Sequence, residues 1–131
     1  MNTDDRSGKE RNTPEMSPAN DVEQPWGRYR VLDEGPGFQV KRLTINPGAA
    51  ISSQSHRHRS EHWIVAAGSA LVTVDGAVER LGPGDTSDVG VGVIHRIQNE
   101  TGEVVEVIEV MYGDHLAEDD ITRYEDMYGR V

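Results

Sequence analysis

Apolar and polar residues alternate along short stretches of the chain, and turn residues separate one stretch from the next. The alternating stretches predict strands at residues 29–33, 38–45, 51–58, 62–67, 70–74, 93–99 and 104–111. Side chains of a strand point alternately to its two faces, so a period of two indicates half-buried strands. Asp75-Gly76 stands between two of these stretches and is typical of a tight hairpin turn. Strands that recur about every ten residues predict an all-β fold, a small antiparallel β-barrel or jelly roll.

The two ends of the chain differ from this pattern. Residues 1–24 are polar, rich in Asn, Ser, Asp, Glu and Pro, and have no apolar period, which predicts a disordered leader. Order is expected to begin near Pro25, so residues 25–131 are expected to form a single domain, in keeping with a length of 131 residues. Residues 115–128 have a weak helical period, and we expect a short helical tail there.

Composition excludes several classes of function. The chain has no cysteine, so a metal would have to bind nitrogen and oxygen ligands. The net charge is −10, which argues against nucleic-acid binding because that requires a basic surface. The apolar runs are far shorter than the roughly 20 residues of a membrane helix, and the first 20 residues lack the apolar centre of a secretory signal. These features predict a cytoplasmic protein that binds neither nucleic acid nor membrane.

Histidines gather in one segment of the chain. His56, His58 and His62 lie within seven residues, next to Gln54 and Glu61, and His95 follows later. On a strand, Gln54, His56 and His58 would share one face. Glu61 has the opposite parity and would reach that face only through a bulge. His62 has the parity of His58 and competes with Glu61 for the inward position. Imidazole with hard oxygen donors suits zinc, manganese, iron, cobalt or nickel. The segment therefore predicts a metal site.

Two spaced motifs in these segments resemble those of the cupin superfamily. The first motif runs through Gly48, Gln54, His56, Glu61 and Gly68, with Gln54 in place of the usual first histidine. The second runs through Gly84, Gly92, His95 and Asn99, with Gly90 where the family has proline. The resemblance implies a cupin barrel whose metal is held by Gln54, His56, Glu61 and His95, with zinc as the first expectation. His58 and His62 are further candidates as ligands or as partners of the ligands.

From about Pro25 onward the chain resembles, more narrowly, the C-terminal cupin domain of type II mannose-6-phosphate isomerases. The resemblance rests on Pro25-Trp26-Gly27, on the order Gln-x-His-x-His-Arg-x-Glu-His-Trp from Gln54 to Trp63, and on the segment from Gly113 to Arg130. In that family the domain usually follows a GDP-mannose pyrophosphorylase. The printed sequence has no Gly-rich phosphate loop at its start, so we expect a free-standing cupin without pyrophosphorylase activity.

The resemblance implies a metal-dependent sugar-phosphate isomerase that interconverts mannose 6-phosphate and fructose 6-phosphate through an enediol. Lys41 and Arg96 are candidates for the catalytic base or the phosphate contact, because such a reaction needs a base and cations. Arg57 and Arg59 are expected at the surface. The alternatives are a non-catalytic module that binds metal and sugar, and a metal-dependent cupin oxygenase. The expected partners are a small sugar phosphate and a second copy of the chain, since open sheet edges favour pairing.

Overall fold

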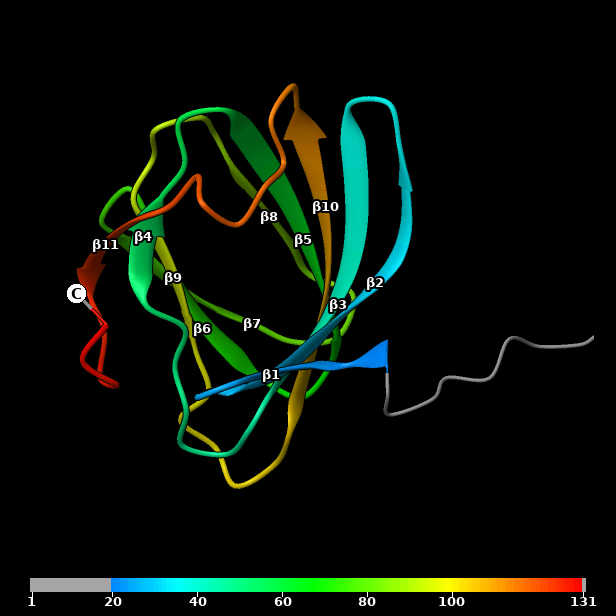
Figure 1. The fold of residues 1–131 in the computed structure, drawn as a ribbon. Coiled ribbons are helices and arrows are strands. Elements are labelled where there is room, and N and C mark those ends of the chain that lie inside the picture. Colours follow the sequence, from blue (N-terminus) through cyan, green and yellow to red (C-terminus); the bar gives the residue numbers. More distant parts are fainter. Residues whose placement is uncertain (1–19, 131) are drawn as a thin grey trace, which may run out of the picture.

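The computed structural model describes residues 20–130, and strands dominate this part of the chain. The strands are β1 (Val22–Gln24), β2 (Gly27–Gly35), β3 (Phe38–Ile45), β4 (Ser53–Ser55), β5 (Arg59–Ala67), β6 (Ala70–Val74), β7 (Ala77–Leu81), β8 (Thr86–Val89), β9 (His95–Gln98), β10 (Val105–Gly113) and β11 (Thr122–Glu125). They form a six-stranded sheet in the order β1-β2-β3-β10-β5-β8 and a five-stranded sheet in the order β11-β4-β9-β6-β7. All pairings are antiparallel, and the two sheets face each other (Figure 1). The all-β prediction is confirmed.

The hydrophobic core lies between the two sheets. In β5 and β10 every second side chain is buried, which is the period of two that the sequence predicts. The buried core residues are Trp26, Leu43, Ile45, Ala49, Trp63, Val65, Ala70, Val72, Leu81, Val89, Ile97, Val105 and Val107. The inward positions at the other end of these strands hold polar side chains instead. One half of the interior is therefore an apolar core, and the other half is free to form a site.

The bounds of two strands, β3 and β6, agree with the sequence prediction to the residue. Four strands were not predicted: β1 and β11 near the two ends, and β7 and β8 within the domain. Strands β7 and β8 are both edge strands of their sheets, and most of their side chains are exposed or half-buried. Edge strands need no alternating apolar face, so their sequences lack the pattern that marks central strands.

The predicted hairpin turn joins β6 and β7. Asp75 and Gly76 both have positive φ angles, 51° and 83°, as a two-residue turn of this kind requires. A second glycine, Gly113, lies at the end of β10, where an added Cβ would fall 2.0 Å from the backbone oxygen of His58. Only a glycine permits this approach of β10 to the start of β5. The close contact fixes the backbone just before the residues that form the candidate site.

Two predictions about the ends need correction. Strand β1 begins at Val22, so order starts within the predicted leader and before Pro25, because β1 pairs with the start of β2. Residues 1–19 lie outside the described part of the chain. The predicted helix over residues 115–128 is wrong. Strand β11 forms there and pairs with β4, and a hydrogen bond of 2.9 Å joins the hydroxyls of Ser55 and Tyr124. In residues 20–130 no helix is long and apolar enough to cross a membrane.

Candidate metal centre

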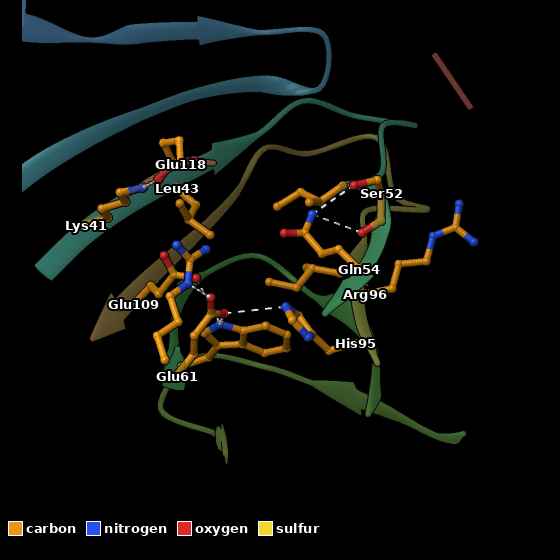
Figure 2. A pocket seen from close by; sticks show the side chains of 13 residues that line it. Lys41, Leu43, Ser52, Gln54, Glu61, His95, Arg96, Glu109 and Glu118 are labelled. Carbon is orange, nitrogen blue, oxygen red and sulfur yellow. Dashed lines mark hydrogen bonds and ion pairs between the residues drawn. The ribbon is translucent and has the colours of Figure 1, made fainter. Parts of the chain in front are cut away.

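One polar group of side chains fills the inward positions of three neighbouring strands. In β5 these are Arg59 and Glu61, followed by Trp63. Glu109 of β10 lies opposite both Trp63 of β5 and Lys41 of β3. Directly paired residues of antiparallel strands project to the same face. Lys41, Glu109 and Trp63 therefore form one row across the sheet, and all three line the same pocket (Figure 2).

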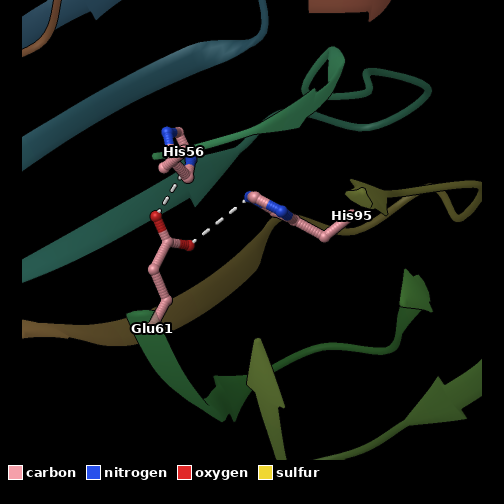
Figure 3. Close-up of side chains that lie close together, drawn as sticks. All are labelled: His56, Glu61 and His95. Atoms are coloured by element: carbon pink, nitrogen blue, oxygen red, sulfur yellow. Dashed lines mark ion pairs between the residues drawn. The ribbon is translucent and has the colours of Figure 1, made fainter. Parts of the chain in front are cut away.

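Three buried side chains, His56, Glu61 and His95, converge at this pocket from different elements (Figure 3). His56 follows β4, Glu61 lies on β5 and His95 begins β9. Their ligand atoms lie within 4.8 Å of one another. His56 Nε2 is 3.2 Å from Glu61 Oε2, and His95 Nε2 is 3.6 Å from Glu61 Oε1. Two imidazole nitrogens and one carboxylate thus meet in a buried space, as in many sites for divalent metals.

The two imidazoles are held in matching orientations. His56 Nδ1 donates to the backbone carbonyl of Asp120 at 2.6 Å, and His95 Nδ1 donates to that of Val93 at 3.0 Å. A carbonyl oxygen can only accept, so each Nδ1 carries a proton and Nε2 of the neutral ring keeps a lone pair. Metal-binding histidines commonly donate their other ring nitrogen in this way, since the bond fixes tautomer and orientation. Both Nε2 atoms face Glu61 in the orientation that a metal would require.

Gln54 is a fourth candidate ligand, and its donor atom is an oxygen. It pairs directly with His95 across β4 and β9, so the two side chains project to the same face. Its Nε2 donates to the hydroxyl and the carbonyl of Ser52 at 2.8 and 3.3 Å. With the amide nitrogen engaged on one side, the Gln54 oxygen points into the pocket (Figure 2). Gln54 is therefore oriented as an oxygen ligand would be.

Burial and mutual contacts set the charges of the site. Burial alone would raise the pKa of Glu61, but its contacts with His56 and Glu109 hold that pKa well below its usual range. Burial, reinforced by the charge of Glu61, raises the pKa of Glu109 well above its usual value. The two carboxyl groups thus differ: Glu61 stays ionised to lower pH than an ordinary glutamate, and Glu109 keeps its proton to higher pH. Burial lowers the pKa of His95, which favours the neutral ring that a metal binds.

The structure overturns the prediction that Arg59 lies at the surface. Arg59 is 5% exposed, and its Nε donates to Glu61 Oε2 at 3.0 Å. Its Nη2 lies 3.2 Å from His56 Nε2, and its Nη1 is buried with no hydrogen-bond partner among the described residues. Arg59 shares the parity of Glu61 and Trp63 on one strand, and that parity was the signal that could have placed it inside.

Glu109 was also missed by the sequence analysis. It stands at an inward position of β10, after Val105 and Val107 and before Met111. A carboxylate in such an alternating apolar row is costly to bury unless it is paired or protonated. Glu109 accepts a hydrogen bond of 3.3 Å from Trp63 Nε1, which also donates to Glu61 at 3.1 Å. A charged residue at an inward position of a predicted strand was the available signal.

Of the two predicted catalytic or phosphate-binding residues, one faces the pocket and the other points away from it. Lys41 is buried and lines the pocket. Arg96 borders the pocket, but its guanidinium points away from the cavity and lies 3.5 Å from Glu125 (Figure 2). This follows from the alternation of β9, because Arg96 is next to the inward His95.

His58 and His62 are not brought to the cluster. His58 is exposed, and its ring lies against His115. His62 lies on the opposite face of β5 from Glu61, where it contacts Asp88 of β8. The turn between β4 and β5 interrupts the alternation of inward and outward side chains. Within β5 the odd-numbered positions face inward, so Glu61 and not His62 points into the site. The predicted choice between Glu61 and His62 is thereby decided in favour of Glu61.

Solved structures with the same fold support the cupin assignment. The CapF capsular polysaccharide assembling protein of Staphylococcus aureus matches with a TM-score of 0.69 and 17% identity, over 80% of this chain and 34% of that chain. An uncharacterised Klebsiella pneumoniae protein with a double-stranded β-helix domain matches with a TM-score of 0.65 and 22% identity, over 86% and 90% of the two chains. At these identities the likeness shows the fold alone.

Sequence relatives are much closer. Mannose-1-phosphate guanylyltransferase ManC of Salmonella typhimurium is 45% identical over 111 residues, which are 85% of this chain and 23% of ManC. The xanthan biosynthesis protein XanB of Xanthomonas campestris is 49% identical over 110 residues, 84% of this chain and 24% of XanB. The chain thus spans less than a quarter of the length of these relatives.

These relatives correct the expected function. The sequence analysis predicted a free-standing sugar-phosphate isomerase, with a non-catalytic module or an oxygenase as alternatives. The matching proteins are instead named for guanylyl transfer to mannose 1-phosphate and for polysaccharide biosynthesis, and this chain corresponds to only a part of each. The expectation of a free-standing isomerase is therefore wrong, because the relatives that this chain matches are larger proteins with other names.

The family itself is established by a match over most of the chain. Residues 11–126 match the family described as mannose-6-phosphate isomerase C-terminal. The match includes both histidine motifs, the pocket and the C-terminal segment that covers it. The relatives carry enzyme names, so the chain is related to enzymes. Its two-sheet fold, the His-His-Glu cluster and this match together show that the chain belongs to the mannose-6-phosphate isomerase C-terminal family of cupin proteins.

Proposed function

We propose that this chain is a metal-binding cupin domain that binds a sugar phosphate and serves an enzyme system for guanylyl transfer to mannose 1-phosphate. One observation carries the proposal. Two buried histidines donate Nδ1 to backbone carbonyls, so both Nε2 atoms face one ionised carboxylate. The relatives supply the metabolic setting, because they are named for that transfer or for polysaccharide synthesis.

The metal ligands in this proposal are His56, Glu61 and His95, with Gln54 as a fourth. Two nitrogens and two oxygens suit zinc first, and manganese, iron, cobalt or nickel as alternatives. When bound, such an ion polarises a carbonyl or hydroxyl oxygen as a Lewis acid. Because Arg59 Nη2 contacts His56 Nε2, a metal and Arg59 compete for the same lone pair. The Arg59 contact with Glu61 orients the carboxylate whether or not His56 is engaged.

The ligand class follows from the groups around the cluster. Lys41 and Arg59 line the pocket and are both cationic, and cations of this kind bind phosphate. Trp63 lines the pocket, and its ring centroid lies 5.6 Å from that of the His95 ring. Glu109 can donate a hydrogen bond when it holds its proton, whereas an ionised Glu61 can only accept. A ligand with hydroxyl groups and one phosphoryl group fits these residues. Its phosphoryl oxygens would accept from the cationic side chains, and its hydroxyl groups could hydrogen-bond with the carboxyl groups.

A binding experiment tests the proposal. The chain, purified without a histidine tag, is analysed for metal content and titrated with mannose 6-phosphate and with mannose by calorimetry. We expect about one zinc per chain, and tighter binding of the phosphorylated sugar. His56→Ala should lose the metal, whereas His62→Ala, on the outer face of the same sheet, should keep it. A wild-type chain that takes up no metal under any loading condition would contradict the proposal.

The same samples decide two finer predictions. The aldose–ketose isomerase class is tested by following the conversion of mannose 6-phosphate, with and without the guanylyltransferase portion of a relative such as XanB. A contribution to guanylyl transfer is tested by adding the chain to that guanylyltransferase portion and measuring the rate of guanylyl transfer to mannose 1-phosphate. A homodimer and a cytoplasmic location also stay predictions. Light scattering measures the first, and fractionation of cells measures the second.

A further inference from the structure

Lys41 is a buried cation at one wall of the pocket. It is 4% exposed, and its Nζ lies 4.2 Å from the centroid of the Tyr29 ring. An ammonium group removed from water is strongly destabilised unless a negative charge or several hydrogen bonds replace its hydration. The aromatic contact compensates only in part. The identity of the group that neutralises Lys41 therefore determines what this wall of the pocket can bind.

Two carboxyl groups lie near Lys41, and it forms an ion pair with one of them. Glu109 is its direct partner across β3 and β10, but the Glu109 carboxyl group accepts its hydrogen bond from Trp63 Nε1. Glu118 comes from the segment between β10 and β11, and its Oε2 lies 2.6 Å from Lys41 Nζ. Glu118 and Lys41 are adjacent at one edge of the pocket, across from Gln54 and His95 (Figure 2). Glu118 is thus the charge partner of Lys41.

Glu118 is held at the pocket in a way that allows exchange. Its side chain is 57% exposed, and the Lys41 contact is its one hydrogen bond or ion pair found among the described residues. Two residues later, Asp120 anchors the segment by accepting from the backbone N–H groups of Arg57 and His58 at 2.9 Å each. The Glu118 carboxylate can therefore leave Lys41 by side-chain rotation while the anchor at Asp120 stays in place.

Arg59 brings an unsatisfied donor to the same pocket. Arg59 lines the pocket, is 5% exposed, and has a buried Nη1 with no hydrogen-bond partner in residues 20–130. A buried guanidinium nitrogen without an acceptor is unfavourable. An anion in the pocket would supply the missing acceptor. Two cations thus line the same cavity. Lys41 has a charge partner that can be exchanged, and Arg59 has a donor that lacks an acceptor.

We propose that Lys41 Nζ is the phosphate-binding position of this pocket, and that the Glu118 carboxylate occupies it as an internal anion which the phosphoryl group displaces. The inference deepens the proposed function and rests on it for the sugar part of the ligand. The ligand class is a phosphomonoester or free phosphate, since both present the same terminal oxygens. Displacing one carboxylate by a dianion leaves Lys41 paired and gives Arg59 Nη1 an acceptor.

Competition with Glu118 makes the site selective. An uncharged sugar cannot replace the carboxylate on Lys41, so it must bind beside an intact ion pair. A phosphorylated ligand exchanges one charged partner for another and does not leave the ammonium unpaired. Glu118 thus weakens phosphate binding somewhat and excludes neutral ligands from the Lys41 position.

Titrations of inorganic phosphate, mannose 6-phosphate and mannose test the inference. They are made by calorimetry on the full chain, both zinc-loaded and chelator-treated. Glu118→Gln removes the competing charge, and we expect it to tighten phosphate and mannose 6-phosphate binding by about two- to fivefold, the range of a single partly exposed ion pair. Lys41→Met should weaken both by about 10- to 100-fold. Asp119→Asn, which changes the neighbouring acid that contacts His115, is the matched control and should change neither.

The outcomes separate this inference from the proposed function. Equal phosphate affinity of Glu118→Gln and wild type, or equal tightening of mannose, would overturn the inference even if zinc binds. Absence of zinc from the wild type contradicts the proposed function, while the chelator-treated titration still reads the competition at Lys41. Tightening for both anions assigns the position to a phosphoryl group of a sugar, and tightening for inorganic phosphate alone assigns it to the free anion. The glutamine oxygen of Glu118→Gln can still accept a hydrogen bond from Lys41 Nζ, and thermal unfolding of each variant verifies that it is folded before the titrations.

Discussion

His56 Nδ1 donates a hydrogen bond of 2.6 Å to the backbone carbonyl of Asp120, 64 residues further along the chain. The Asp120 carboxylate in turn accepts from the N–H groups of Arg57 and His58. The first histidine motif and the C-terminal segment are thus tied together at both backbone and side chain. In Figure 1 the segment after β10 crosses one end of the fold from the six-stranded to the five-stranded sheet. The orientation of a candidate metal ligand therefore depends on this crossing segment.

Asp120→Ala tests that dependence. Loss of the carboxylate releases two backbone N–H groups and loosens the carbonyl that orients His56, so zinc affinity should fall by about tenfold, as for other groups that position a metal ligand. Competition with a chromogenic chelator measures the affinity. Asp119→Ala is the control, because Asp119 contacts the exposed His115 instead. Equal zinc affinity of Asp120→Ala and wild type would show that the segment does not position His56.

Glu109→Gln tests the protonated state of Glu109. Burial raises the pKa of Glu109 well above 4.5, so the folded chain keeps a proton that the unfolded chain releases above that pH. Folded-state stability must then fall as pH rises through the window above 4.5. Glutamine is neutral and retains a donor and an acceptor, so the variant should remove this decline. Urea unfolding of chelator-treated protein between pH 5 and pH 8 measures it. A variant that keeps the wild-type slope would place the proton elsewhere.

The lowered pKa of Asp126 predicts a pH dependence of stability with the opposite sign. Hydrogen bonds from the Arg130 side chain, at 2.6 and 3.2 Å, are the main cause that lowers the pKa of Asp126 from 3.8. The stabilisation is present above the ordinary Asp value and is lost as pH falls through the lowered value. Asp126→Asn should therefore flatten the loss of stability below about pH 4, the ordinary Asp range. Thermal unfolding from pH 2.5 to pH 5 measures it, with the exposed Asp119→Asn as control.

Substitution of Asn99 is expected to lower the stability of the fold without changing metal binding. Its side-chain amide donates to the carbonyls of Ile45, Asn46 and Glu103, and its oxygen accepts from Thr101. Asn99→Ala leaves several buried backbone groups unpaired, so the free energy of unfolding should fall by about 2–4 kcal/mol. Zinc affinity of the folded protein should stay unchanged, because none of these contacts reaches the metal cluster. A loss of zinc affinity at constant stability would give Asn99 a role in the site.

The interior of the sheets follows from local pattern, and so do some of the site residues. Alternation placed β3 and β6 to the residue, because central strands bury one face and need apolar residues at every second position. The spacing of the two motifs selected Gln54, His56, Glu61 and His95. The fold gathers His56, Glu61 and His95 in one cluster, and Gln54 lines the pocket beside it. The edge strands β7 and β8 escaped prediction, since strands with few buried side chains carry no such pattern.

The sequence by itself determined the two-sheet architecture, the hairpin at Asp75-Gly76 and the identity of the cluster residues. Each of these depends on the backbone geometry of nearby residues or on a short spacing. Only the tertiary structure decided that Arg59 and Glu109 are buried, that His62 faces outward, and that Glu118 pairs with Lys41 from 77 residues away. Burial and charge pairing depend on which strands become neighbours, and the chain sets that through long-range packing.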